Sequence, residues 1–515
     1  MENNGQLKRI LIATFISFVF FVAYDYFVLS PQQAKAQKIL KAQERKQEAK
    51  ISPKTEKTKI DTAKKAVDNL QMVTVVESKN YRIKIDSLGR IESFVLKQNK
   101  FDTKKGKHLE LVNKKLPKPL EIRFKDEKLN KEAFSVKVKA DKSKVEIDNS
   151  PKSVTLTQQL NGLSLIKKIT FYPDGHYDVK VTLSKPVVYY ITQGYRPSVA
   201  IDKLTIHGLV VKKSDGTLKI IEDSDAVEEN IKDAIFSAGF DRYYTTLLFS
   251  KKPFEVVIVP DNDKNPISYI KCDSNSEFIG YIGPKFVDTL KSIDPNLVDV
   301  VQYGVGTFFA KNLFFLLDFF YKLVGNWGVA IILLVVLVRL VLFPLTYKGM
   351  VSMYKLKELA PKMKEIQEKY KKDPQKLQMH MMKLYKEHGA NPLGGCLPLV
   401  LQIPIFYGIY KLLLYAIELK GASFLWIHDL SLMDPYFILP VLMGVSMYIH
   451  QRLTPTNFQD PMQEKVFRFL PLIFTFMMAT FPAGLVLYWT VNNILSVLQQ
   501  WLINRIMAVK KGENK

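Results

Sequence analysis

The sequence is poor in the residues on which most catalytic and metal sites depend. Only two cysteines occur among 515 residues, Cys272 and Cys396, in segments that we expect on opposite sides of a membrane, which excludes a disulfide framework. His108, His176 and His207 are too scattered for a recognisable metal-ligand spacing, and there is no Gly-x-Ser-x-Gly elbow. A Gly-x-x-x-x-Gly-Lys-[Ser/Thr] loop is also missing. We therefore expect no covalent chemistry, no cofactor, no metal and no nucleotide hydrolysis.

Acidic residues are missing from the interiors of the long apolar runs, and one of these runs contains an arginine. Arg339 interrupts the run from Val329 to Phe343. Burying a guanidinium at the centre of a membrane helix costs roughly 2.5 to 3.5 kcal/mol on insertion scales, so something must offset that cost. One solution is a side chain that leans towards the helix end marked by Pro344 and Lys348. The other, which we favour, is a cavity that holds water or a polar guest beside Arg339.

The first 72 residues consist of two polar segments on either side of one apolar run. The formal net charge is +24, which suits anionic lipid headgroups or ribosomal RNA equally well. Residues 1–9 include Lys8 and Arg9 and are predicted to be cytoplasmic, and 10–29 form a transmembrane anchor. A cleavable signal peptide is the alternative, but the apolar run exceeds the usual 7 to 15 residues. Residues 30–72 form a polar linker.

Residues 73–305 contain short strands with alternating apolar side chains. Examples are Tyr81 to Ile85 and Tyr177 to Leu183, and Asp174-Gly175 marks a turn. The pattern predicts an antiparallel β-sandwich domain outside the cytoplasm, serving as a scaffold or docking surface. Residues 306–326 follow as an aromatic-rich amphipathic helix at the membrane interface, for which a buried core helix is the alternative.

A lysine-rich stretch, 348–389, divides at Asp373-Pro374 and is predicted to form a helical hairpin. Its excess of lysine over acidic residues places it in the cytoplasm. Its methionines either receive varied apolar sequences or pack the two helices together. They are Met350, Met353, Met363, Met379, Met381 and Met382.

The hairpin belongs to a predicted core, 327–506, with five membrane spans, followed by a basic cytoplasmic tail, 507–515. After the span that contains Arg339, the others are 397–416, 436–449, 469–481 and 485–506. The fold class is thus a multi-domain α and β chain: a polytopic α-helical membrane core, with six spans including the N-terminal anchor, and the antiparallel β-sandwich domain. Polar side chains in the spans either line one hydrophilic groove with Arg339 or link helices by hydrogen bonds. They are Gln402, Tyr407, Tyr488, Trp489, Thr490, Asn492 and Asn493.

Several motifs of this core occur together and are specific. They are Asn391-Pro-Leu-Gly-Gly-Cys-Leu-Pro398, Gln402-Ile-Pro-Ile-Phe-Tyr407, Leu425-Trp-Ile-His-Asp-Leu430, Asp434-Pro-Tyr-Phe-Ile-Leu-Pro440 and Phe481-Pro-Ala-Gly-Leu-Val-Leu-Tyr488. Through them the region 326–506 closely resembles the bacterial YidC membrane protein insertases. The N-terminal anchor, the β domain and the interfacial helix extend the resemblance over nearly the whole chain, in the Gram-negative form with a large periplasmic domain.

The resemblance implies an insertase and folding chaperone of the bacterial inner membrane. Arg339 matches the family's groove arginine, and the hairpin matches the element that receives substrates. Tyr488 and Trp489 fall where members carry substrate-contacting aromatics, although a Tyr-Tyr pair is common there. The implied partners are nascent inner-membrane proteins, the Sec translocase and the phospholipid bilayer, with the ribosome and signal recognition particle components as further candidates. A transporter that binds an anion at Arg339, or a membrane-anchored structural β protein, are the alternatives from other functional classes.

Overall fold

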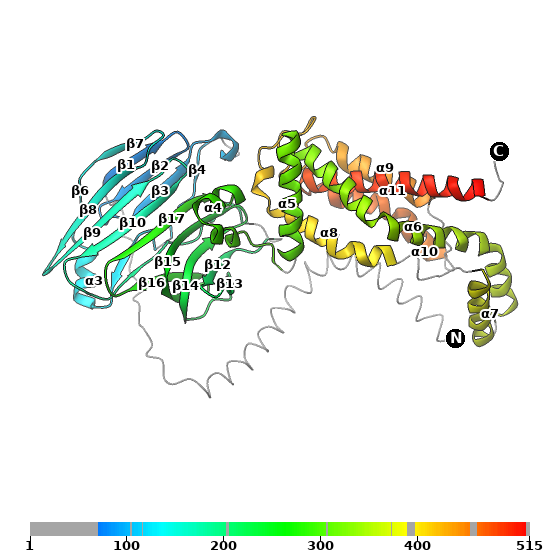
Figure 1. Ribbon diagram of the computed structural model, residues 1–515, viewed down its shortest axis with the longest axis horizontal. Coiled ribbons are helices and arrows are strands. Elements are labelled where there is room, and N and C mark those ends of the chain that lie inside the picture. The colour runs from blue at the N-terminus through cyan, green and yellow to red at the C-terminus, as the bar shows by residue number, and fades with distance from the viewer. Residues whose placement is uncertain are drawn as a thin grey trace.

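The computed structural model describes residues 71–510, apart from 104–105, 116, 202–204, 305–306, 372, 389–396 and 454–460. The predicted cytoplasmic N-terminus, anchor, and nearly all of the linker lie outside the described residues, as do Cys396 and the tail from 511 onwards. A β-rich domain forms one end of the molecule and a helical body the other, with helix α5 between them (Figure 1).

The β-rich domain contains two sheets among the described residues. The smaller has the order β4-β3-β2-β1-β7, and its one parallel pair is β1 with β7. Its strands are β1 (Met72–Ser78), β2 (Tyr81–Asp86), β3 (Ile91–Leu96), β4 (Leu109–Glu110) and β7 (Lys144–Ile147). The β-rich character predicted from the sequence is confirmed, whereas the predicted antiparallel pairing has an exception in the parallel pair of β1 and β7.

The larger sheet follows the order β13-β12-β14-β15-β17-β10-β9-β8-β6, with β16, β11 and β5 paired off this path. Its strands are β5 (Ile122–Phe124), β6 (Lys139–Ala140), β8 (Lys152–Leu160), β9 (Leu163–Phe171), β10 (His176–Leu183), β11 (Tyr189–Ile191), β12 (Gly208–Lys213), β13 (Leu218–Glu222), β14 (Glu229–Phe240), β15 (Tyr244–Pro260), β16 (Pro266–Cys272) and β17 (Ser276–Pro284). Short helices accompany the strands: η2 (Asn99–Phe101), α3 (Glu127–Ala133), α4 (Val287–Ile293) and η3 (Pro295–Val300).

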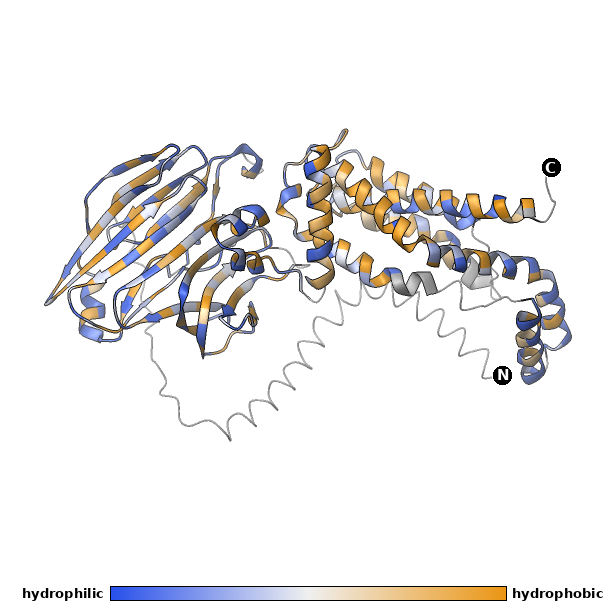
Figure 2. Ribbon diagram, viewed as in Figure 1, coloured by the Kyte–Doolittle hydropathy of each residue, from blue (hydrophilic) through white to orange (hydrophobic). Residues whose placement is uncertain are grey.

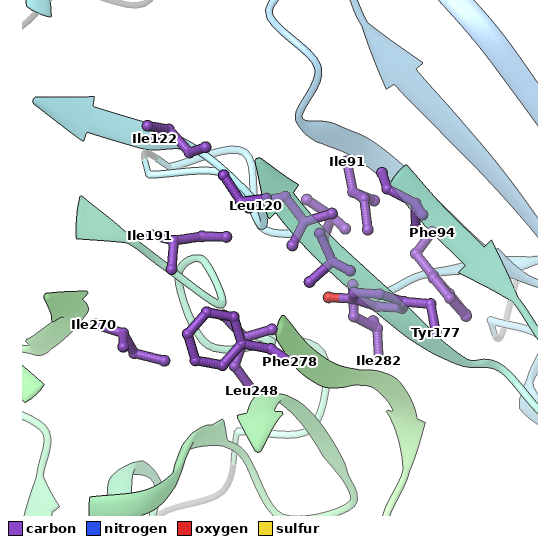
Figure 3. Packing of buried hydrophobic residues seen from close by; sticks show 14 of the residues in the cluster. Ile91, Phe94, Leu120, Ile122, Tyr177, Ile191, Leu248, Ile270, Phe278 and Ile282 are labelled. Atoms are coloured by element: carbon purple, nitrogen blue, oxygen red, sulfur yellow. The ribbon is translucent and has the colours of Figure 1, made fainter. Parts of the chain in front are cut away.

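Both sheets contribute to one apolar core. In β2 the buried residues Tyr81, Ile83 and Ile85 alternate with exposed Arg82 and Lys84, as expected for a strand with one face on the core. Figure 3 shows side chains of β3 meeting those of β10 and β17 in this core. Cys272 is buried there as a free thiol, and burial raises its pKa to about 11.

An ion network is buried between the strands of this domain. The Arg90 guanidinium donates to Asp86 at 2.8 Å and to Glu121 at 2.9 Å. Arg123 donates to the other oxygen of Glu121 at 2.9 and 2.7 Å. Lys167 Nζ donates to the carbonyl oxygen of Leu120 at 3.1 Å, and burial lowers its pKa to about 8. Such charges are tolerated in a core because each has a close partner.

The helical body contains seven α-helices among the described residues. They are α5 (Thr307–Val324), α6 (Trp327–Lys369), α7 (Pro374–Glu387), α8 (Leu397–Tyr415), α9 (Ile438–Leu453), α10 (Pro461–Met478) and α11 (Ala483–Lys510), with the short η5 (Ile417–Leu419) after α8. Apolar residues dominate α5 and the adjoining parts of α6, α8, α9 and α11, whereas α7 and the end of α6 are largely polar (Figure 2).

Helix α6 differs from the sequence-based expectation of separate membrane and hairpin helices. It runs without a break through Pro344 and Pro361, so the span that contains Arg339 continues directly into the hairpin. Asp373 caps α7 by accepting from the amide of Lys376 at 3.1 Å, at the predicted division of the hairpin. By length and composition, one helix in the described part of the chain, Trp327–Leu356, could cross a membrane. The count of six spans is not confirmed by this structure and stays a prediction.

The end of α8 ties the helical body to the β domain. The Tyr415 hydroxyl accepts from the amide of Ile206 at 2.7 Å, and Arg242 Nε donates to the carbonyl oxygen of Leu414 at 2.7 Å. Ile417, just beyond α8, is buried in the core cluster of the β domain. The two parts therefore share packed surface, and the β domain fixes the position of α8.

Candidate functional site

Arg339 of α6 is held by hydrogen bonds to α11. Its Nε donates to Oδ1 of Asn492 at 2.8 Å, and Nη1 donates to Oε1 of Gln499 at 3.1 Å. Nη2 donates to the carbonyl oxygen of Asn492 at 2.9 Å and to the Ser496 hydroxyl. The side chain therefore points at α11 rather than along α6 to the helix end, and Arg339 is 8% exposed.

No carboxylate among the described residues forms an ion pair with the Arg339 guanidinium. All three residues that accept from it are neutral, and arginine stays protonated in proteins. A guanidinium has five N–H groups, of which these bonds occupy four, leaving one on Nη1. Arg339 is thus fixed in place while it retains its positive charge and one donor.

The α11 partners share one helix face. Asn492, Ser496 and Gln499 are spaced at i, i+4 and i+7, the spacing that places side chains along one side of a helix. Asn492 is among the predicted groove residues, whereas Ser496 and Gln499 are not, because a carboxylate was the partner expected for a buried arginine. The helical spacing of neutral polar residues on α11 was the signal that could have found them.

A small cavity adjoins the arginine. Its volume is about 10 Å³, which is room for about one water. Four predicted groove residues line it, namely Arg339, Gln402, Tyr488 and Asn492. The remaining lining residues are Val335, Val338, Leu342, Thr346 and Ile405. In this conformation α6, α8 and α11 therefore enclose a narrow recess beside the charge.

Four predicted groove residues lie outside the lining of this recess. One of them is Thr490, whose hydroxyl donates to the carbonyl oxygen of Val486 at 2.7 Å. The Trp489 ring packs against Phe406 of α8, with centroids 4.9 Å apart, and against Phe474 of α10 at 5.5 Å. Tyr407 lies near Lys411, whose Nζ is 5.5 Å from the centroid of its ring. Asn493 is 8% exposed, and its Nδ2 has no hydrogen-bond partner among the residues described. Trp489 thus connects α8, α10 and α11 beside the site.

A second, larger and apolar cavity lies next to the first. It is an open groove of about 250 Å³ between α5, α6 and α8. Of the residues that line it, Asn312 alone is polar. The lining consists of Phe308, Phe309, Asn312, Leu313, Leu316, Leu337, Val338, Val341, Leu342 and Ile405. Helix α5 carries further exposed aromatic residues outside this lining, including Phe315 and Phe319.

The methionines of the hairpin differ in how far their side chains are buried. Met363 packs between α6 and α7 against the buried Leu359 and Leu384, which is the packing role considered for it. Met379 and Met382 on α7 are exposed, at 59% and 51%. Met350 and Met381 are partly buried, whereas Met353 lies in α6 with its side chain outside the described residues. The exposed pair could therefore contact an apolar partner.

Comparison with known proteins gives a consistent set of matches. Residues 319–511 match the family model described as 60Kd inner membrane protein. The chain is similar to the membrane protein insertase YidC of Wolinella succinogenes, at 52% identity over 99% of this chain and 98% of the relative. It is also similar to the YidC of Campylobacter jejuni, at 49% identity over 98% and 97% of the two chains.

Solved structures match as well. One, described as an active YidC insertase crystal structure with the first transmembrane domain resolved, is 21% identical and covers 83% of this chain and 94% of its own, with a TM-score of 0.37. YidC from Thermotoga maritima is 17% identical over 83% of this chain and 99% of its own, with a TM-score of 0.33.

Proposed function

Because the chain belongs to the YidC family of membrane protein insertases, we propose that it moves nascent transmembrane segments from the cytoplasm into the inner membrane past Arg339. The observation that carries this proposal is the buried guanidinium, which neutral groups hold in place without cancelling its charge. The protein would act by binding and release alone, as an insertase and folding chaperone without covalent chemistry or nucleotide hydrolysis.

The proposed orientation follows from charge. The hairpin formed by the end of α6 and by α7 carries many lysines, so it lies in the cytoplasm. Both chain termini lie on the same side, and the β domain lies in the periplasm. Helix α5 lies in the membrane interface at the periplasmic side, between the β domain and the spans.

The hairpin would make the first contact with a substrate. Met379 and Met382 present flexible, polarizable side chains to solvent, and such side chains adapt to different apolar sequences. Because α6 is continuous from Arg339 to the hairpin, a segment bound at the hairpin lies at the C-terminal end of the helix that carries Arg339.

The recess would then lower the cost of moving a polar flank partway across the membrane. Placing an unpaired polar or charged group in an apolar environment costs several kcal/mol. The charge on Arg339 and its remaining N–H group offset part of that cost, most of all for an acidic flank. The recess must widen beyond its present volume of about 10 Å³ to admit such a flank.

Transfer of the apolar segment into lipid would complete the insertion. Burial of apolar surface contributes about 25 cal/mol per Å², which is enough to drive a transmembrane segment out of a polar recess and into the bilayer without nucleotide hydrolysis. The substrates are nascent inner-membrane proteins. We further propose that the protein works alone or with the Sec translocase, and that the ribosome and signal recognition particle components deliver substrates to it.

Insertion into liposomes tests this function. A short single-span protein with an acidic tail is synthesised beside liposomes that contain the full chain, and protease protection of its translocated tail is measured. We expect protection to exceed that in protein-free liposomes of the same lipid composition. Equal protection in the two preparations would contradict an autonomous insertase.

A further inference from the structure

The apolar groove between α5, α6 and α8 adjoins the recess beside Arg339. Val338, Leu342 and Ile405 line both cavities, so the two spaces are separated by single side chains. One space presents a fixed charge, and the other presents almost entirely apolar walls. Together they match the two parts of a membrane protein segment, a hydrophilic flank joined to an apolar helix.

The groove is held open by the placement of α5. Gly408 of α8 faces Phe309 so closely that a Cβ atom on the glycine would lie 2.7 Å from Cβ of Phe309. This contact fixes α5 against α8, while the N-terminal half of α5 forms one wall of the groove. Lys311 of α5 also pairs with Asp299 of η3, which anchors the helix to the β domain. The groove is therefore part of the folded framework.

The lining residues show which side of α6 faces the groove. Val341 lines the groove and is 70% exposed. Its neighbour Leu340 is 65% exposed but does not line the groove, since successive residues of a helix point about 100° apart. The two positions lie at the same depth with similar exposure and differ in direction.

We infer that this groove receives the apolar segment of a nascent protein while its polar flank lies beside Arg339. The inference rests on the proposed function and adds to it a binding site and a direction of release, past Val338 and Leu342 towards α5. A phospholipid acyl chain is the competing occupant. A lipid keeps its headgroup at the surface, whereas Arg339 lies 12 residues into α6, or roughly 18 Å along the helix. The shared wall of the two cavities therefore favours a segment whose polar part lies deep in the membrane.

Photocrosslinking tests the inference. A benzophenone side chain replaces Val341 in the full chain, and Leu340 in a matched control. Both proteins are placed in liposomes with a nascent single-span substrate and irradiated, and the adducts are separated by mass. We expect adducts between the substrate's apolar segment and position 341 to exceed those at position 340 several-fold. Equal yields, or an adduct of lipid mass alone at position 341, would overturn the inference.

Insertion in the same liposomes separates this inference from the proposed function. If the substrate is inserted without a preference for position 341, the groove is not its path and the insertase function stands. If neither the two crosslinking variants nor the wild-type protein insert the substrate, the inference and the proposed function both fail. As a second measurement, Val341→Trp fills the groove and should slow insertion several-fold relative to Leu340→Trp. Equal rates in the two variants would also contradict the inference.

Discussion

Replacing Glu121 by glutamine should destabilise the β domain strongly, because this carboxylate holds two arginines in its core. Glu121 is 1% exposed and accepts from Arg90 at 2.9 Å and from Arg123 at 2.9 and 2.7 Å. Glutamine keeps the shape but removes the negative charge that Glu121 presents to both Arg90 and Arg123. Breaking a buried ion pair in this way costs about 3 to 5 kcal/mol.

Hydrogen exchange measures that cost in the intact protein. Glu121 directly precedes β5, whose amides pair with β11, so the amides of Ile122–Phe124 report local opening. Since about 1.4 kcal/mol corresponds to a tenfold change in an equilibrium constant, we expect exchange there to accelerate by roughly 100-fold or more.

A matched control comes from Glu92, whose side chain is 34% exposed and pairs with Lys118 at 3.0 Å. Glu92→Gln removes the same charge from a partly exposed pair, which contributes about 0 to 1 kcal/mol. Exchange should therefore change by less than about tenfold. If Glu121→Gln changed exchange no more than Glu92→Gln does, the argument that the buried network stabilises the domain would be wrong.

Three further predictions concern the junction of the two parts and the hairpin. Burial raises the pKa of Glu418 to about 7, so the protonated side chain favours the folded junction and the stability of the junction falls as pH rises from about 4.5 to 7. Glu418→Gln should remove this pH dependence and increase stability at pH 8 by about 1 to 3 kcal/mol, measured by hydrogen exchange around η5. Tyr415→Phe removes the acceptor for the amide of Ile206 and should cost about 1 to 3 kcal/mol in the same assay, whereas no change would show that the bond is not needed. Replacing both Met379 and Met382 by serine should reduce crosslinking of nascent chains to α7 while leaving thermal unfolding unchanged, because both side chains are exposed; unchanged crosslinking would exclude them as a receiving surface.

The β domain could be predicted because its pattern is local. Alternating side chains such as Tyr81, Ile83 and Ile85 identify a strand from a few residues, and the structure buries them as expected. The parallel pairing of β1 with β7 could not be predicted, because it joins segments about 70 residues apart that carry no mark of their partner. Strand order is likewise determined by packing across the core.

Part of the candidate site could also be predicted from local sequence patterns. Arg339 was identified because a cation in an apolar run is costly, and Asn492 because it is polar in a predicted span. Ser496 and Gln499 were missed, since the residues that satisfy a guanidinium need not be acidic and their shared helix face matters only once α11 lies beside α6. Trp489 was predicted to line the groove, but which aromatic rings it contacts depends on how α8 and α10 pack.

The central claim is that a fixed positive charge at Arg339 assists insertion. The most direct test compares wild type, Arg339→Lys and Arg339→Ala in liposomes, with substrates whose translocated tails are acidic or neutral. Lysine keeps the charge, although it cannot reproduce the branched hydrogen bonds to Asn492, Ser496 and Gln499. We expect insertion of the acidic-tailed substrate by wild type and Arg339→Lys, and its loss in Arg339→Ala. Equal insertion by all three proteins would contradict the role assigned to Arg339.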